Sequence, residues 1–209
     1  MYDIALFLHL LGVALLIGAV TTTVLATLRA QTASTVSEIR LLTAVMKKID
    51  LVIGPAMLLI LADGLYMVSR HGGDGSIRWS SGWVDVALVI FLAMAVLGPT
   101  VEAGHAKRLL VAATEAPDGA VPVSLDALRR SPVPIYVSLF GVSQILAFLF
   151  LMTDKPGLPA SLATCAVATV ASAGLAWLRL RSLPQPRQVR VPLRAQYQQD
   201  ARPTVLDKS

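Results

Sequence analysis

Apolar residues fall in long, uninterrupted runs along this chain, and short polar segments separate the runs. A helix that crosses the hydrocarbon core of a bilayer, which is roughly 30 Å thick, needs about 20 mostly apolar residues. Surface helices of small soluble proteins keep a polar face and are not apolar over such lengths. The pattern therefore predicts an all-α, polytopic membrane bundle with five transmembrane helices, at about residues 4–28, 51–68, 83–98, 132–152 and 159–178.

A different pattern occupies residues 35–49, just before the second span. Thr35 followed by Glu38 has the spacing of an N-terminal capping box. We predict an amphipathic helix at the inner face, either along the membrane or packed under the bundle. An ordinary solvated connecting helix explains the pattern equally well. The apolar positions recur at intervals of three and four residues, at Val36, Ile39, Leu42, Met46 and Ile49.

The remaining segments have the composition of loops. Residues 70–82 are rich in Gly and Ser, and residues 115–131 contain Pro and Gly, so both segments predict irregular structure. Residues 182–209 are rich in Pro, Gln and Arg and lack apolar periodicity, which predicts a disordered basic tail. The predicted division is a transmembrane helical domain over residues 1–181, followed by this tail.

Composition supports a membrane protein and excludes a water-soluble globule. Only 15% of the residues are charged, compared with about 25% in soluble domains, and the mean hydropathy is +0.67. The first apolar run follows Asp3 and precedes Arg29, the reverse of the charge order in a signal peptide, so we expect a retained helix. The single cysteine, Cys165, lies inside an apolar run and excludes an intramolecular disulfide.

The distribution of basic residues predicts the topology. If the N-terminus is outside and five helices cross the membrane, only Arg70, Arg78 and Lys155 among the 18 lysines and arginines lie outside. Inner segments of membrane proteins carry such an excess of positive charge. We therefore predict a multi-pass protein of the inner (cytoplasmic) membrane with an inner C-terminus. The basic tail suits anionic lipid headgroups at the inner face better than nucleic acid.

Ionisable residues inside a membrane are costly and mark candidate sites. His9, Asp63 and Asp85 lie in the outer parts of three spans, and His71 lies in the adjoining outer loop. Imidazole with carboxylate suits zinc or copper(II), or a proton relay. The alternatives are that the two aspartates reach the outer headgroups and that His9 is a neutral histidine hydrogen-bonded between helices.

Two further polar features lie elsewhere in the predicted bundle. Glu102 and His105 are three residues apart on an expected helical extension of the third span, at its inner end, and share a helix face, which suits a local ion pair at the surface. Gln144 is the amide of the fourth span, and we expect it to tie helices together. His9 and His105 lie at opposite levels, so they are not predicted to share one haem.

Three stretches of the sequence resemble a bacterial family of predicted integral membrane proteins, domain of unknown function 2269. They are YDIALFLHLLGVALLIGAV, KKIDLVIGPAMLLILADGLYMV and FLFLMTDKPG, within residues 1–157. The resemblance implies a four-helix membrane core without an established activity, to which this chain adds a fifth span and a basic tail. The first stretch is also distantly similar to copper-resistance D proteins, but a second histidine inside a span and a Met-rich outer cluster are missing here.

No catalytic motif is recognisable, so the sequence predicts a protein that is not a stand-alone enzyme and has no resident cofactor. Our leading hypothesis is a small structural or accessory membrane subunit, which contacts the bilayer and other membrane proteins or further copies of itself. The alternative is a small transporter or a protein that handles copper, zinc or haem.

Overall fold

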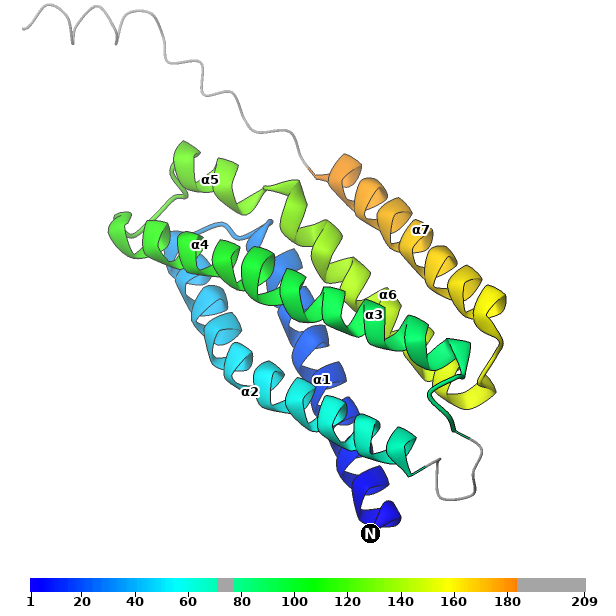
Figure 1. Ribbon diagram of the computed structural model, residues 1–209. Coiled ribbons are helices and arrows are strands. Elements are labelled where there is room, and N and C mark those ends of the chain that lie inside the picture. The colour runs from blue at the N-terminus through cyan, green and yellow to red at the C-terminus, as the bar shows by residue number, and fades with distance from the viewer. Residues whose placement is uncertain (71–76, 184–209) are drawn as a thin grey trace, which may run out of the picture.

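The computed structural model describes residues 1–70 and 77–183, and this part of the chain is helical (Figure 1). The described elements are α1 (Tyr2–Ala30), α2 (Val36–Ser69), α3 (Gly82–Leu97), the π-helix η1 (Gly98–Ala103), α4 (Gly104–Glu115), α5 (Val123–Arg129), α6 (Pro132–Asp154) and α7 (Leu158–Ser182). Five of the described helical segments are long and apolar enough to cross a membrane, which confirms the predicted class. His71 and most of the predicted tail lie outside the described residues.

The predicted amphipathic segment and the predicted second span form one continuous helix, α2. Thr35 caps it, because its hydroxyl accepts a hydrogen bond from the backbone N–H of Glu38 at 3.3 Å. The Glu38 carboxylate reaches back to the N–H of Ser34 at 3.1 Å and also pairs with Arg29. This is a shifted version of the predicted capping box. Pro55 lies inside the helix without ending it.

The third span continues as a helix beyond residue 98, as expected for the extension that carries Glu102 and His105. Proline in a helix interior removes one backbone N–H and crowds the carbonyl four residues earlier. Around Pro99 the chain widens into the π-helical turn η1 and then resumes as α4. The three elements appear in Figure 1 as one long rod. This continuation carries Glu102 and His105 into the bundle.

The bundle has two well-packed pairs, α1 with α2 and α6 with α7, and α1 also packs against α6. Gly12 allows the closest approach within the first pair, since a Cβ there would lie 2.9 Å from Ile60 Cγ1 and 3.2 Å from the Ala56 carbonyl oxygen. Gln144 ties the second pair, as expected, by donating from Nε2 to Thr169 Oγ1 at 3.0 Å. Helix α7 lies at the edge of the bundle in Figure 1.

The two ends of the bundle differ in construction. We call them the N-terminal end, where α1 begins, and the α5 end. At roughly 1.5 Å per residue, α2 is about 50 Å long and extends beyond one bilayer core. Its first turns join α4 and α5 in a separate apolar cluster at the α5 end, with Val36, Ile39, Leu109, Ala113 and Leu125 buried.

Two arginines join the helices at the α5 end through hydrogen bonds to backbone carbonyls. Arg40 of α2 donates to the carbonyls of Ala113 and Ala116 at the end of α4, at 2.7 and 2.6 Å. Arg129 of α5 donates to the carbonyls of Ala30, the last residue of α1, and of Ala33 in the turn that follows. These carbonyls terminate helices or turns, so each guanidinium satisfies acceptors that the helices leave unpaired. At the N-terminal end, by contrast, α3 has little direct contact with α2.

Candidate functional site

A large cavity occupies the N-terminal half of the bundle, between α1, α2, α3 and α6. Its volume is about 440 Å³. Most of the side chains that line it are aliphatic or aromatic, among them Leu6, Leu16, Ile60, Trp79, Trp83, Phe91 and Phe148. The weak contact between α2 and α3 leaves this space unfilled. The cavity therefore offers an apolar environment inside the predicted outer part of the membrane.

His9 provides a polar side chain in the wall of this cavity. The ring is buried, with 6% of its surface exposed, and Nδ1 lies 3.0 Å from the carbonyl oxygen of Ile60. Because a carbonyl only accepts, Nδ1 carries the proton and Nε2 keeps the lone pair. One of the two alternatives for His9, a neutral histidine hydrogen-bonded between helices, therefore agrees with the contact that Nδ1 makes. The other nitrogen is able to accept a hydrogen bond or bind a metal.

Gly64 makes room for the ring on α2. A Cβ at this position would lie 3.5 Å from His9 Cε1 and 3.7 Å from Nδ1, which is ordinary contact distance. A larger side chain would occupy the space of the imidazole. The small-residue stretch Ala62-Asp63-Gly64 thus places His9 of α1 against the backbone of α2.

The other predicted outer residues do not all join His9. Asp63 is near enough for its charge to act on the imidazole, and its Oδ2 is buried without a hydrogen-bond partner in the described part of the chain. Asp85 is exposed, between the buried residues Val84 and Val86, and so faces away from the bundle interior. Within residues 1–70 and 77–183, no three His, Cys, Asp or Glu side chains come together as metal ligands.

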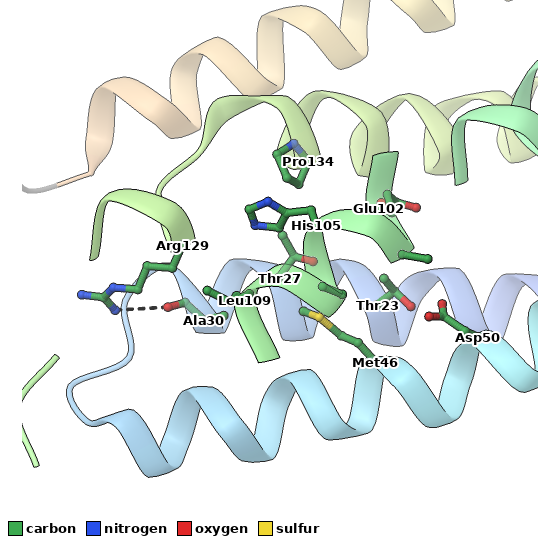
Figure 2. A pocket seen from close by; sticks show the side chains of 12 residues that line it. Thr23, Thr27, Ala30, Met46, Asp50, Glu102, His105, Leu109, Arg129 and Pro134 are labelled. Carbon is green, nitrogen blue, oxygen red and sulfur yellow. Dashed lines mark hydrogen bonds between the residues drawn. The ribbon is translucent and has the colours of Figure 1, made fainter. Parts of the chain in front are cut away.

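A second, much smaller cavity lies toward the α5 end, and Figure 2 shows its lining. Its volume is about 20 Å³. Side chains from four parts of the chain meet there: Thr23 of α1, Asp50 of α2, Glu102 of η1, and His105 of α4. Polar groups from distant segments converge here on a space of about one water molecule.

Glu102 and His105 line this cavity together, as their spacing predicts, but the structure shows no ion pair between them. The Glu102 carboxylate instead accepts a hydrogen bond from the hydroxyl of Ser138 on α6. The His105 ring is buried, with 8% of its surface exposed. The pair belongs to an interhelical contact because helix α3 continues through η1 into α4 and turns both side chains inward.

Sequence reasoning missed Thr23, Asp50 and Ser138 as members of this second site. Thr23 belongs to the run Thr21-Thr22-Thr23 within a span, where three hydroxyls in succession are a weak polar signal. Asp50 follows Lys47 and Lys48 and resembles part of a solvated charge cluster. Only the packing of α1, α2 and α6 around η1 brings Thr23 and Asp50 to one cavity with Glu102, and Ser138 to the Glu102 carboxylate.

Comparison with known proteins agrees with this architecture. No curated protein and no solved structure matches the chain. One family does match, described as "Predicted integral membrane protein (DUF2269)", over residues 3–156, which contain α1 to α6 and both cavities. The match ends just before α7, in agreement with a four-helix core plus one added span. The chain therefore belongs to this family of predicted integral membrane proteins.

Proposed function

We propose that this protein is a small membrane carrier that binds one apolar or amphiphilic small molecule in the cavity beside His9. The observation that carries the proposal is the cavity itself, with its volume of about 440 Å³ and one buried imidazole in an apolar wall. Binding sites for small molecules have volumes of roughly 300–1,000 Å³ and combine an apolar lining with few polar groups.

The lining indicates the chemistry of the ligand. The apolar body would pack against aliphatic side chains and against the rings of Trp79, Trp83 and Phe91. A polar group that donates a hydrogen bond would meet Nε2 of His9, since Nδ1 is occupied by Ile60. These features together suit a lipid-soluble weak acid or alcohol rather than an inorganic ion.

The packing of the helices offers such a ligand a route. Helices α2 and α3 have little direct contact along their apolar parts, so the cavity lies next to a weak seam of the bundle. A molecule dissolved in the bilayer would enter sideways between these helices without crossing water. This route suits a carrier whose ligand is already concentrated in the membrane.

Tryptophan fluorescence provides a direct test, because Trp79 and Trp83 line the cavity and Trp177 lies on α7. In purified Trp177→Phe protein in detergent, a dibrominated long-chain fatty acid should quench the remaining fluorescence in a saturable manner. Ala87→Phe, which places a ring in the cavity, should weaken the apparent affinity roughly tenfold or more, equivalent to about 1.4 kcal/mol. Ala163→Phe is the matched control, because Ala163 is exposed on α7.

Equal, non-saturable quenching in both variants would contradict a binding cavity. The accessory-subunit hypothesis predicts a different result, namely a partner protein or a homo-oligomer that stays bound during purification in mild detergent. Saturable binding by a monodisperse monomer would favour the carrier over the subunit.

The remaining expectations belong to the same proposal. We place the protein in the inner (cytoplasmic) membrane, with the α5 end and the basic tail facing anionic headgroups inside. The exposed ring of Trp177 beneath Arg181, 3.6 Å from the guanidinium carbon to the ring centroid, supports an interfacial position for the end of α7. The carrier works by binding, so neither catalysis nor a resident metal or haem is part of the proposal.

A further inference from the structure

We infer that the small cavity at the α5 end binds one small monovalent cation, sodium or hydronium, through Thr23, Asp50 and Glu102. This site is separate from the large cavity, at the other end of the bundle, and does not depend on what that cavity binds. Three independent features support it: unbalanced negative charge, an unpartnered hydroxyl and the size of the space.

The charge in this cavity lacks a cationic partner. Among the described residues, neither Glu102 nor Asp50 forms an ion pair. Arg129 also lines the cavity, but its guanidinium is engaged by the Asp126 carboxylate and by the carbonyls of Ala30 and Ala33. The two carboxylates lie close enough for the charge of Asp50 to act on Glu102. Glu102 is partly buried, and a carboxylate taken out of water requires a compensating charge, which a bound cation would supply here.

The hydroxyl of Thr23 points to a missing ligand. The residue is only 7% exposed, and Oγ1 has no hydrogen-bond partner in the described part of the chain. Figure 2 shows the Thr23 and Asp50 side chains directed toward each other from α1 and α2. A buried polar atom without a partner costs about 1–3 kcal/mol. A cation between the two helices would use this oxygen as a ligand.

The size and donor chemistry select the kind of cation. A volume of about 20 Å³ holds one water molecule or one dehydrated small ion, and not a hydrated divalent ion. Hydroxyl and carboxylate oxygens suit hard cations. Asp50 is exposed and forms the outer edge of the site, while Glu102 lies deeper in the π-helical turn η1. Such turns interrupt the regular pattern of backbone hydrogen bonds and often accompany functional sites.

Thermal unfolding of the full-length protein in detergent tests the sodium form. At constant ionic strength, replacing choline chloride by sodium chloride should raise the midpoint by about 3–6 °C at a tenfold excess over Kd. Thr23→Val, which replaces the hydroxyl by a methyl group of similar size, and Glu102→Gln should abolish this rise. Thr23→Ser should retain it. Glu115→Gln is the matched control, because Glu115 is exposed at the end of α4 and lies outside the cavity.

The hydronium form has its own signature in choline chloride alone. Wild-type stability should then decrease as the pH rises and the bound proton is lost, and Thr23→Val should reduce this dependence. The groups that face the site are Asp50 of α2, His105 of α4 and Arg129 of α5. Thr23→Val changes none of them, so titration of His105 alone would leave the variant and wild type alike. Wild type and variants that respond equally to sodium and to pH would overturn the inference.

Discussion

At the scale of single residues, His9 combines a structural and a chemical role. Its Nδ1 proton goes to the Ile60 carbonyl, which joins α1 to α2 across the wall of the large cavity. The bond fixes the tautomer and leaves Nε2 as the acceptor, an arrangement that also orients histidine ligands in metal sites. Asp63 acts on the ring through its charge, whereas the hydrogen bond of the ring is made to the Ile60 carbonyl.

We predict that His9→Ala destabilises the protein more than His9→Gln. Alanine leaves a buried carbonyl and a void, at a cost of about 1–3 kcal/mol, whereas the Gln amide can still donate to Ile60. For a chain of this length the midpoint of thermal unfolding should fall by roughly 3–10 °C for His9→Ala. Asp85→Asn, at an exposed position, should leave the midpoint unchanged. Equal midpoints for both His9 variants and wild type would show that the hydrogen bond is dispensable.

At the scale of elements, the seam between α1 and α2 is the most extensive helix contact in the bundle. Its closeness depends on Gly12, which faces the backbone of α2 at Ala56. Membrane helices gain much of their association from such close packing, since lipid offers no hydrophobic drive between them. Gly18 lies on the same helix, but a Cβ there would meet nothing within 4 Å.

The two glycines therefore make a matched pair of tests. Gly12→Ala should separate α1 from α2 and lower stability by about 1–3 kcal/mol, because the new methyl group meets a backbone carbonyl that cannot rotate away. Gly18→Ala should be neutral or should stabilise by about 0.5–1 kcal/mol through helix propensity. Thermal unfolding in detergent measures both. A larger loss for Gly18→Ala than for Gly12→Ala would refute the described seam.

At the scale of the whole molecule, the two ends of the bundle differ: the α5 end is held together by hydrogen bonds and packing, and the N-terminal end contains the large cavity. Arg40, Arg129 and the apolar cluster around Ile39 hold the α5 end together. The large cavity and the weak contact of α3 with α2 lie at the N-terminal end. Parts of a protein with fewer packed contacts open more readily. The proposed carrier would therefore admit its ligand at the N-terminal end, with the α5 end as a fixed base.

The uneven distribution of lysine and arginine predicts how the bundle is oriented in the membrane, and a reporter fusion tests this orientation. With the N-terminus outside, a reporter that is active only outside should be silent when fused after Ser209 and active when inserted between Gly72 and Ser76. The N-terminal end with the large cavity then faces outward, and the α5 end faces inward. An active reporter after Ser209 would show that the orientation is the reverse of the predicted one or that the number of spans is not five.

The sequence by itself determined the class of the protein and the approximate position of each span. This is possible because the bilayer imposes a local requirement, about 20 apolar residues in a helix, that needs no knowledge of neighbouring helices. The predicted spans 132–152 and 159–178 differ from α6 and α7 by a few residues at most of their ends. The segment at 35–49 and the second span are one continuous helix, α2, and the expected helical extension of the third span continues through η1 to Glu115 of α4.

Only the tertiary structure decided which polar residues meet. Depth in the membrane follows from sequence position, but the direction of a side chain depends on how its helix is rotated against its neighbours. His9, Asp63 and Asp85 share a predicted level, yet Asp85 faces outward and the backbone of Ile60 is the partner of His9. Thr23, Asp50 and Glu102 are separated by 27 and 52 positions, and they share a cavity because three helices pack around one π-helical turn.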